Sequence, residues 1–84
     1  AFDFEKTRRF PGGQLGLKLN VKGGIIQDMR ISGDFFGKRD VTELAALLIG
    51  EQYREETIRC LLNAVDFEEY FTAISRDNFI ECLF

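Results

Sequence analysis

A strictly alternating segment, residues 15–22, constrains the fold of this chain more than any other part of its sequence. Its apolar side chains are two residues apart, and the side chains between them are small or polar. A period of two is typical of a β-strand with one buried face. Gly23-Gly24 follows at once, and two glycines between strand-like segments predict a tight hairpin. The sequence therefore predicts an antiparallel sheet whose apolar face needs a second layer.

Two further strands are predicted around this segment. Residues 2–10 alternate less regularly and predict an edge strand, which ends at Pro11 because proline lacks the backbone donor of a sheet ladder. Residues 25–31 predict the third strand. The side chains expected on its apolar face are Ile25, Met29 and Ile31. Ile26 then falls on the polar face and Gln27 on the apolar one, so we expect an irregularity at the start of this strand.

Helices are expected to supply the second layer. Val41–Leu48 carries a helical apolar stripe, with Asp40 as N-cap, Glu43 completing a variant of the capping box, and Gly50 at the C′ position. The remaining expected elements are a helix over 54–64, a helical turn or two over 66–71 and a short helix capped by Ser75. We predict one α+β domain over residues 1–84, with three to four helices packed on one face of a three-stranded antiparallel sheet (β-β-β-α-α-α).

Charge is distributed unevenly along the chain. Residues 1–33 carry a net charge of +3 and residues 34–84 carry −6. A basic sheet beside acidic helices could steer a charged partner, and the alternative is that both are ordinary solvated faces. The overall net charge of −3 disfavours nucleic acid as the partner. No apolar run approaches the ~20 residues of a membrane span and no signal peptide is visible, while the start at Ala1 suggests a longer or processed chain.

The chain offers little for catalysis. It has no histidine, and no nucleophile motif is present. Cys60 and Cys82 lack metal-site spacing, so we expect reduced thiols in a cytoplasmic protein and no metal site. Arg8 and Arg9 precede Pro11-Gly12-Gly13, which fits either a simple turn or an anion contact. We expect no catalytic residue and no bound cofactor in this chain by itself.

The segment from Gly33 to Gly37 predicts a bent connection after the third strand. It reads Gly-Asp-Phe-Phe-Gly, and two adjacent Phe cannot both face the core from a regular strand. The segment either seals the core or forms an aromatic patch that docks another domain. The residues that we single out as interface candidates are Lys22, Gly33, Asp34, Phe35, Phe36 and Gly37.

These residues resemble the small C-terminal accessory domain of lipoate–protein ligases. The matching segments are Arg9-Phe10, Val21-Lys22-Gly23-Gly24-Ile25-Ile26, Ile31-Ser32-Gly33-Asp34-Phe35-Phe36-Gly37, Asp40-Val41 with Glu43-Leu44, Leu48-Ile49-Gly50 with Tyr53, and Tyr70-Phe71 with Ile74-Ser75. They follow in the expected order over nearly the whole chain. Thr72-Ala73 departs from the pattern, in a position that we expect to be a loop.

The resemblance implies a role that the residues alone do not. Such ligases use ATP and magnesium to convert lipoate to lipoyl-adenylate, and then transfer the lipoyl group to a lysine. The acceptors are lipoyl domains of 2-oxoacid dehydrogenases or the glycine cleavage protein. Catalysis belongs to a larger domain of the same ligase, which is the implied partner, and the small domain is implied to act as a movable lid.

Two other functions remain open at this point. A sulfur-transfer or iron–sulfur scaffold has a similar order of elements and would depend on Cys60 or Cys82. A phosphate or nucleic-acid binder would use Arg8, Arg9, Lys18 and Lys22, and its affinity would fall steeply with salt.

Overall fold

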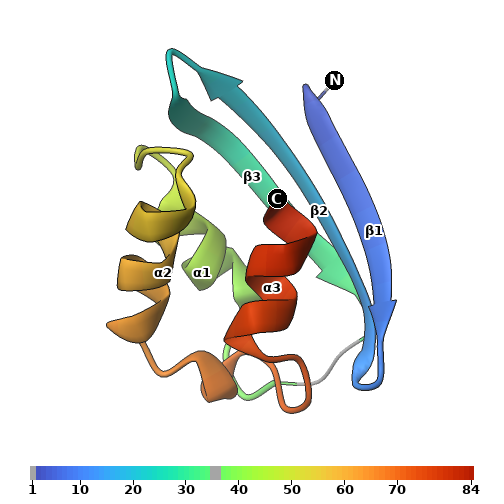
Figure 1. Ribbon diagram of the computed structural model, residues 1–84. Coiled ribbons are helices and arrows are strands. Elements are labelled where there is room, and N and C mark those ends of the chain that lie inside the picture. Colours follow the sequence, from blue (N-terminus) through green and yellow to red (C-terminus); the bar gives the residue numbers. More distant parts are fainter. Residues whose placement is uncertain (1, 35–36) are drawn as a thin grey trace.

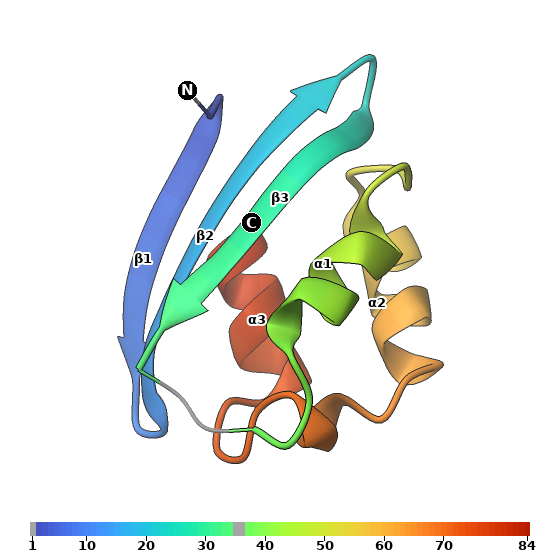
Figure 2. The ribbon, with the colours of Figure 1, turned by 180° about the vertical axis from the view of Figure 1, so that it is seen from behind.

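Three antiparallel strands precede three helices in the computed structural model, which describes residues 2–34 and 37–84. The elements are β1 (Phe4–Phe10), β2 (Gly13–Lys22), β3 (Ile25–Gly33), α1 (Val41–Leu48), α2 (Glu55–Asn63), a 3-10 turn η1 (Phe67–Glu69) and α3 (Arg76–Leu83). All helices lie on one side of the sheet (Figures 1 and 2). This arrangement confirms the predicted fold class and its order of elements.

The sheet has the order β1-β2-β3, so β2 is its central strand. Leu15, Leu17 and Leu19 point to the helices and are buried to 1% exposure or less. Cross-strand pairing puts Arg8, Lys6 and Phe4 of β1 opposite these three leucines. The alternation in β2 that the sequence shows is therefore the alternation between the core and the outer face of the sheet.

A β-bulge at the start of β3 changes which isoleucine enters the core. Asn20 pairs with Asp28 and Val21 pairs with Ile26, so Gln27 is the extra residue. Ile26 is fully buried, whereas Ile25 is half-buried and pairs with Lys22. The predicted irregularity is confirmed, but placing Ile25 on the face of Met29 was wrong, because the bulge reverses the alternation before it.

The cap of α1 agrees with the sequence only in part. The Asp40 side chain accepts a hydrogen bond from the N–H of Thr42, at 2.9 Å, rather than from that of Glu43. The Glu43 carboxylate instead accepts from the guanidinium of Arg39 at 2.6 Å. Gly50 lies just beyond the helix with φ +92°, as expected of a C′ glycine.

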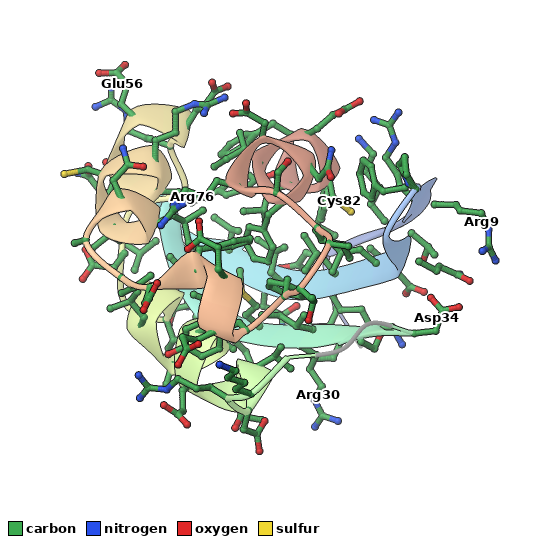
Figure 3. The ribbon with its side chains drawn as sticks, turned by 90° about the horizontal axis from the view of Figure 1, so that it is seen from below. Arg9, Arg30, Asp34, Glu56, Arg76 and Cys82 are labelled. Atoms are coloured by element: carbon green, nitrogen blue, oxygen red, sulfur yellow. The ribbon has the colours of Figure 1, made fainter. Side chains whose placement is uncertain are left out.

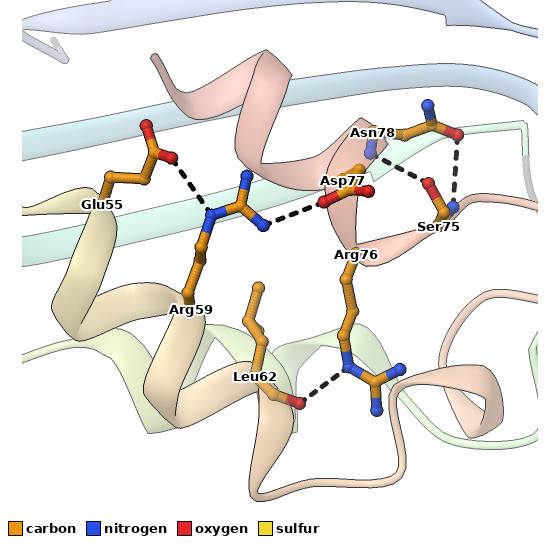
Figure 4. Close-up of polar contacts among 7 residues, drawn as sticks. All are labelled: Glu55, Arg59, Leu62, Ser75, Arg76, Asp77 and Asn78. Carbon is orange, nitrogen blue, oxygen red and sulfur yellow. Dashed lines mark hydrogen bonds and ion pairs between the residues drawn. The ribbon is translucent and has the colours of Figure 1, made fainter.

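Arginines join α2 to α3 (Figure 4). Arg59 bonds Glu55 at 3.0 Å within α2 and Asp77 of α3 at 2.8 Å. Arg76 donates to the carbonyl oxygens of Leu62 and Val65, at 3.0 and 2.9 Å, near the C-terminal end of α2. Carbonyl oxygens at a helix end lack intrahelical partners, so this cation satisfies them and fixes the angle between the helices.

Aromatic rings fill the core near the N-terminal end of α3. Phe67, Phe71 and Phe79 have ring centroids 5.0–5.9 Å apart and are at most 1% exposed. Ser75 caps α3 in a capping box with Asn78, which confirms the predicted start of this helix. In the described part of the chain, no helix has the length and apolar character needed to cross a membrane.

Candidate functional site

The predicted interface segment lies at one end of the sheet, which we call the loop end. It comprises the β1–β2 turn at Pro11–Gly13, residues 33–34 and 37–40 after β3, and the loop at residues 70–75. Figure 1 shows these segments together at the bottom of the molecule, below the helices. Segments from three separate parts of the sequence thus form one surface.

Asp34 joins β3 to the β1–β2 turn. Its side chain accepts a hydrogen bond from the backbone N–H of Gln14, and its own N–H donates to the Gln14 carbonyl at 3.2 Å. Gly13, at φ +133°, leaves room for the Asp34 carbonyl, because a Cβ at Gly13 would lie 2.5 Å from that oxygen. The aspartate therefore holds the loop end in place, and Figure 3 shows it at the edge of the sheet.

Gly37 packs directly on the backbone beyond η1. A Cβ at this position would overlap the carbonyl oxygen of Tyr70. The next two backbone N–H groups, of Lys38 and Arg39, both donate to the Glu69 carbonyl, at 2.7 and 2.9 Å. The Arg39 guanidinium lies 5.5 Å from the Tyr70 ring centroid, a cation–π distance. This side of the loop end is thus fixed by the helical layer.

A second glycine brings the β1–β2 turn against the helical layer. A Cβ at Gly12 would overlap the carbonyl group of Ala73. The position at which the sequence departs from the family pattern, Thr72-Ala73, is therefore part of the loop end, and both the carbonyl group and the Cβ of Ala73 approach Gly12. Close backbone contact of this kind tolerates a change of side chain at Ala73 better than a change at Gly12.

The structure brings together only some of the predicted interface candidates. Gly33, Asp34 and Gly37 belong to the loop end, whereas Phe35 and Phe36 lie outside the described residues. Lys22 is exposed at the β2–β3 hairpin, at the opposite end of β3. Eight residues of strand separate it from Gly33, a distance of roughly 25 Å. One small contact cannot include both places.

Arg8 and Arg9, which could together have held an anion, lie on opposite faces of β1. Arg8 faces α3 and pairs with Glu81 at 3.0 Å. Arg9 is on the outer face, 3.5 Å from the Gln14 side-chain oxygen, and Figure 3 shows it pointing outward. Arg8 and Arg9 therefore cannot hold one phosphate together, and Pro11–Gly13 forms the turn between β1 and β2.

The two cysteines are unpaired and differ in environment. Cys82 is fully buried, with its Sγ 3.7 Å from the Lys6 carbonyl oxygen and 3.8 Å from that of Leu15. Burial raises the pKa of the Cys82 thiol, which disfavours the reactive thiolate. Cys60 is exposed on α2. Within residues 2–34 and 37–84, no three His, Cys, Asp or Glu side chains are grouped as metal ligands.

The sequence did not indicate several residues that shape this site. Lys38, Arg39 and Glu69 link the connection to η1 through backbone bonds and a Lys38–Glu69 ion pair at 3.9 Å. The sequence offered one sign that this segment approaches another part of the backbone, the glycine before Lys38. It did not indicate the partner, because Glu69 is some 30 residues away along the chain. A tertiary contact of this kind has no local pattern.

Comparison with known proteins identifies the family. A family model described as "Bacterial lipoate protein ligase C-terminus" matches residues 1–83. The lipoate-protein ligase LplJ of Bacillus subtilis (strain 168) is 39% identical over 83 residues, which cover 99% of this chain and 25% of that protein. A lipoate–protein ligase of Streptococcus pyogenes serotype M5 is 37% identical over 83 residues, covering 99% and 24%. This chain thus spans about a quarter of the length of these relatives.

A solved structure shares the fold. It is described as an archaeal lipoylation system, a bi-partite lipoate protein ligase and its E2 lipoyl domain from Thermoplasma acidophilum. The match has a TM-score of 0.81 and 26% identity, and covers 96% of this chain and 93% of that one. With the family model matching nearly every residue, the chain belongs to the lipoate protein ligase C-terminal domain family.

Proposed function

We propose that this chain is the accessory, lid-like domain of a lipoate–protein ligase. In this role it assists the ATP-dependent activation of lipoate to lipoyl-adenylate and the transfer of the lipoyl group to a lysine of an acceptor domain. The observation that carries the proposal is the archaeal match, in which a chain of nearly the same extent belongs to a structure described as a bi-partite ligase. A separate chain of this size fits a module that works beside a catalytic part.

The loop end is the surface that we assign to the catalytic part. A lid contributes by shape and by excluding water, so it needs a fixed surface rather than acid–base groups. Asp34 and Gly37 provide such a surface, because each attaches the connection to a different neighbouring segment. Phe35 and Phe36, between these attachments in the sequence, remain interface candidates from the sequence alone. Lys22 would need a second contact at the hairpin.

ATP, magnesium and lipoate are assigned to the catalytic part rather than to this chain. The described residues of this chain hold no group of three or more side chains suited to a metal ion. The acceptor we propose is a lipoyl domain of a 2-oxoacid dehydrogenase or the glycine cleavage protein. The free thiols of Cys60 and Cys82 fit a reducing, cytoplasmic location.

The experiment that tests this function replaces the matching quarter of the Bacillus subtilis ligase by this chain. The ligase without that quarter and the chimera are compared for pyrophosphate release with ATP, magnesium and lipoate, and for transfer to an unmodified lipoyl domain. We expect the truncated enzyme to lose at least one of these activities and the chimera to regain it. A truncated enzyme with full rates in both steps would contradict an accessory role.

A charge reversal at the loop end locates the contact. Lys38 is 85% exposed there, and Arg54 is 63% exposed at the start of α2. Lys38→Glu and Arg54→Glu change the net charge equally. If the loop end faces the catalytic part, we expect Lys38→Glu to lower pyrophosphate release in the chimera and Arg54→Glu to leave it unchanged. Equal effects would remove the loop end from this role.

The sulfur-transfer or iron–sulfur scaffold is the weaker alternative. Such a function needs accessible thiolates, and Cys82 contributes to the core instead. A native thiol that is labelled at near-neutral pH much faster than free cysteine would favour the scaffold function.

A further inference from the structure

The outer face of the sheet, opposite the helices, carries a charge pattern that the proposed function does not explain. Residues of β1, β2 and β3 alternate between this face and the core, and the helices are all on the other side (Figures 1 and 2). The charged side chains on the outer face are Asp3, Glu5, Arg9, Lys18, Lys22, Asp28 and Arg30. The face is therefore polar and open to solvent.

Most cations on the helical side of the described chain form ion pairs, and those on the outer face do not. Every arginine and lysine after residue 36 forms an ion pair with a nearby carboxylate. The cations of the outer face, Arg9, Lys18, Lys22 and Arg30, form no ion pair with any described residue. In the described part of the chain, the cations without an ion pair thus lie on the outer face, except Lys6, which faces the helices and donates to the Glu81 carbonyl oxygen.

Two of these cations lie directly opposite each other. Lys18 of β2 pairs across the ladder with Arg30 of β3. Like charges in this position destabilise a sheet, so the contact between these two cations does not itself favour folding. Glu5 lies opposite Lys18 on the other strand without forming an ion pair. The Arg30 guanidinium lies 5.9 Å from the centroid of the Phe2 ring, and Figure 3 shows it pointing away from α3.

A strip of small side chains adjoins this pair. Gly16 lies between Thr7 and Ser32 on the neighbouring strands. A Cβ at Gly16 would be 2.9 Å from the Ser32 hydroxyl oxygen and 3.4 Å from that of Thr7. Gly16 itself is buried, and the exposed residues beside it, Thr7 and Ser32, place two hydroxyl groups next to the Lys18–Arg30 pair. Carboxylates accept hydrogen bonds from hydroxyls and attract cations, so the surroundings of Gly16 suit acidic side chains of a protein.

We define the basic patch as Arg9, Lys18 and Arg30 around Gly16. It extends over four residues of β2, about 13 Å, which is enough for several carboxylates on one partner surface. Asp3 and Asp28 limit it toward the hairpin, and together with Glu5, which lies opposite Lys18, they reduce the net charge of the whole face to +1. A nucleic acid longer than the patch would also lie against these acidic residues and would be repelled by a chain whose net charge is −3. The charge pattern therefore favours a small acidic protein surface over nucleic acid.

We propose that the basic patch docks an acidic surface of the acceptor protein. The inference rests on the proposed function, which supplies an acceptor that must bind and leave in every catalytic cycle. Exposed, flat and charged surfaces suit such transient encounters, since electrostatic attraction raises association rates without a large apolar contact. Stable permanent interfaces are larger and more apolar. The loop end remains for the catalytic part, so both partners can be bound together.

The test uses the chimeric ligase and an unmodified lipoyl domain as the acceptor. The variants are Lys18→Glu, the double variant Lys18→Glu/Arg30→Glu, and Arg54→Glu as the control with the same charge change as the single variant. We expect the double variant to raise the KM for the acceptor about tenfold at low salt, consistent with a loss of roughly 1.4 kcal/mol in affinity. This difference should disappear near 0.5 M salt, because exposed charges are then screened.

Three readouts separate the outcomes. Pyrophosphate release without acceptor should be unchanged in all variants, and a loss there would overturn the proposal by showing that the patch contacts the catalytic part. An unchanged KM, or an equal rise in Arg54→Glu, also overturns it. Salt-sensitive binding of a 20-nucleotide single strand that Lys18→Glu abolishes would make the patch a nucleic-acid site instead. A chimera that fails to release pyrophosphate would contradict the proposed function itself, before the patch is tested.

Discussion

Replacing Gly37 by alanine removes the close backbone contact that fixes the loop end. The new Cβ would overlap the Tyr70 carbonyl oxygen. The atoms nearest to it belong to the backbone of Glu69 and Tyr70, so no flexible side chain can move aside to make room. Separating the two segments breaks the bonds from Lys38 and Arg39 to the Glu69 carbonyl. Each of these two hydrogen bonds contributes a net stabilisation of about 0.5–1.5 kcal/mol to the free energy of unfolding. The cation–π contact of Arg39 adds about 0.5–1 kcal/mol, so we expect Gly37→Ala to cost about 2–4 kcal/mol.

Gly24→Ala is the matched control for this substitution. Gly24 has no atom within 4 Å of a built Cβ, but its φ of +77° is unfavourable for any residue with a side chain. Its cost should be about 1–2 kcal/mol, from backbone strain alone. The comparison therefore separates steric overlap at Gly37 from the general preference of turns for glycine.

Urea denaturation followed by circular dichroism measures the loss in free energy of unfolding for both variants, and a thermal melt gives their Tm. For a domain of this size, each kcal/mol corresponds to about 4–8 °C in Tm, so a cost of about 2–4 kcal/mol should lower the Tm of Gly37→Ala by roughly 8–32 °C in a thermal melt. Amide hydrogen exchange of Lys38 and Arg39 should accelerate in Gly37→Ala and remain slow in Gly24→Ala. The reasoning is wrong if Gly37→Ala costs no more than the control and leaves both amides protected, because the segments would then separate without losing their bonds.

Three further predictions concern the helical layer. Arg76→Met keeps the aliphatic stem but removes the bonds to the end of α2, so we expect it to lower the free energy of unfolding by about 2–3 kcal/mol in urea. The N–H of Thr42 lowers the pKa of Asp40 below its usual value, so its stabilisation is complete above the unfolded pKa and is lost as pH falls through the folded one. Stability should therefore decline below about pH 4, and Asp40→Asn should show a smaller decline than the wild type. A maleimide reagent should label Cys60 rapidly and Cys82 at the rate of unfolding, whereas fast labelling of both would contradict the burial of Cys82.

The sequence predicted the elements whose signals are local. The alternation of residues 15–22 and the glycines after it define the central hairpin, and the misplaced phase of Ile26 and Gln27 correctly indicated the bulge. It could not show which isoleucine the bulge would bury. That depends on which residue of the strand is the extra one, and the sequence pattern does not distinguish Gln27 from its neighbours.

The loop end was predictable as a place but not as a set of contacts. Two glycines around adjacent phenylalanines indicated a bent connection that needs backbone room. The reason for Gly37 lies far away in the sequence, since it packs against the Tyr70 carbonyl, whereas Gly33 has a positive φ of +148° that favours glycine locally. Local preferences also misassigned Glu43, because a capping box and an ion pair with Arg39 compete for the same carboxylate.

The separation of charge along the chain gives the two surfaces different physical roles. At the loop end, Lys38 and Arg39 are paired with acidic neighbours, so the shape of this surface is fixed and its charge is largely neutralised. On the outer face, Lys18 and Arg30 are unpaired, so the field of that surface reaches into solvent. Under the two proposals, the catalytic part is a permanent neighbour that fits the fixed shape of the loop end. The acceptor is a transient partner that the charge of the outer face attracts from a distance. Salt should therefore weaken acceptor transfer far more than adenylation in the same enzyme, because only the transient contact depends on unscreened charge.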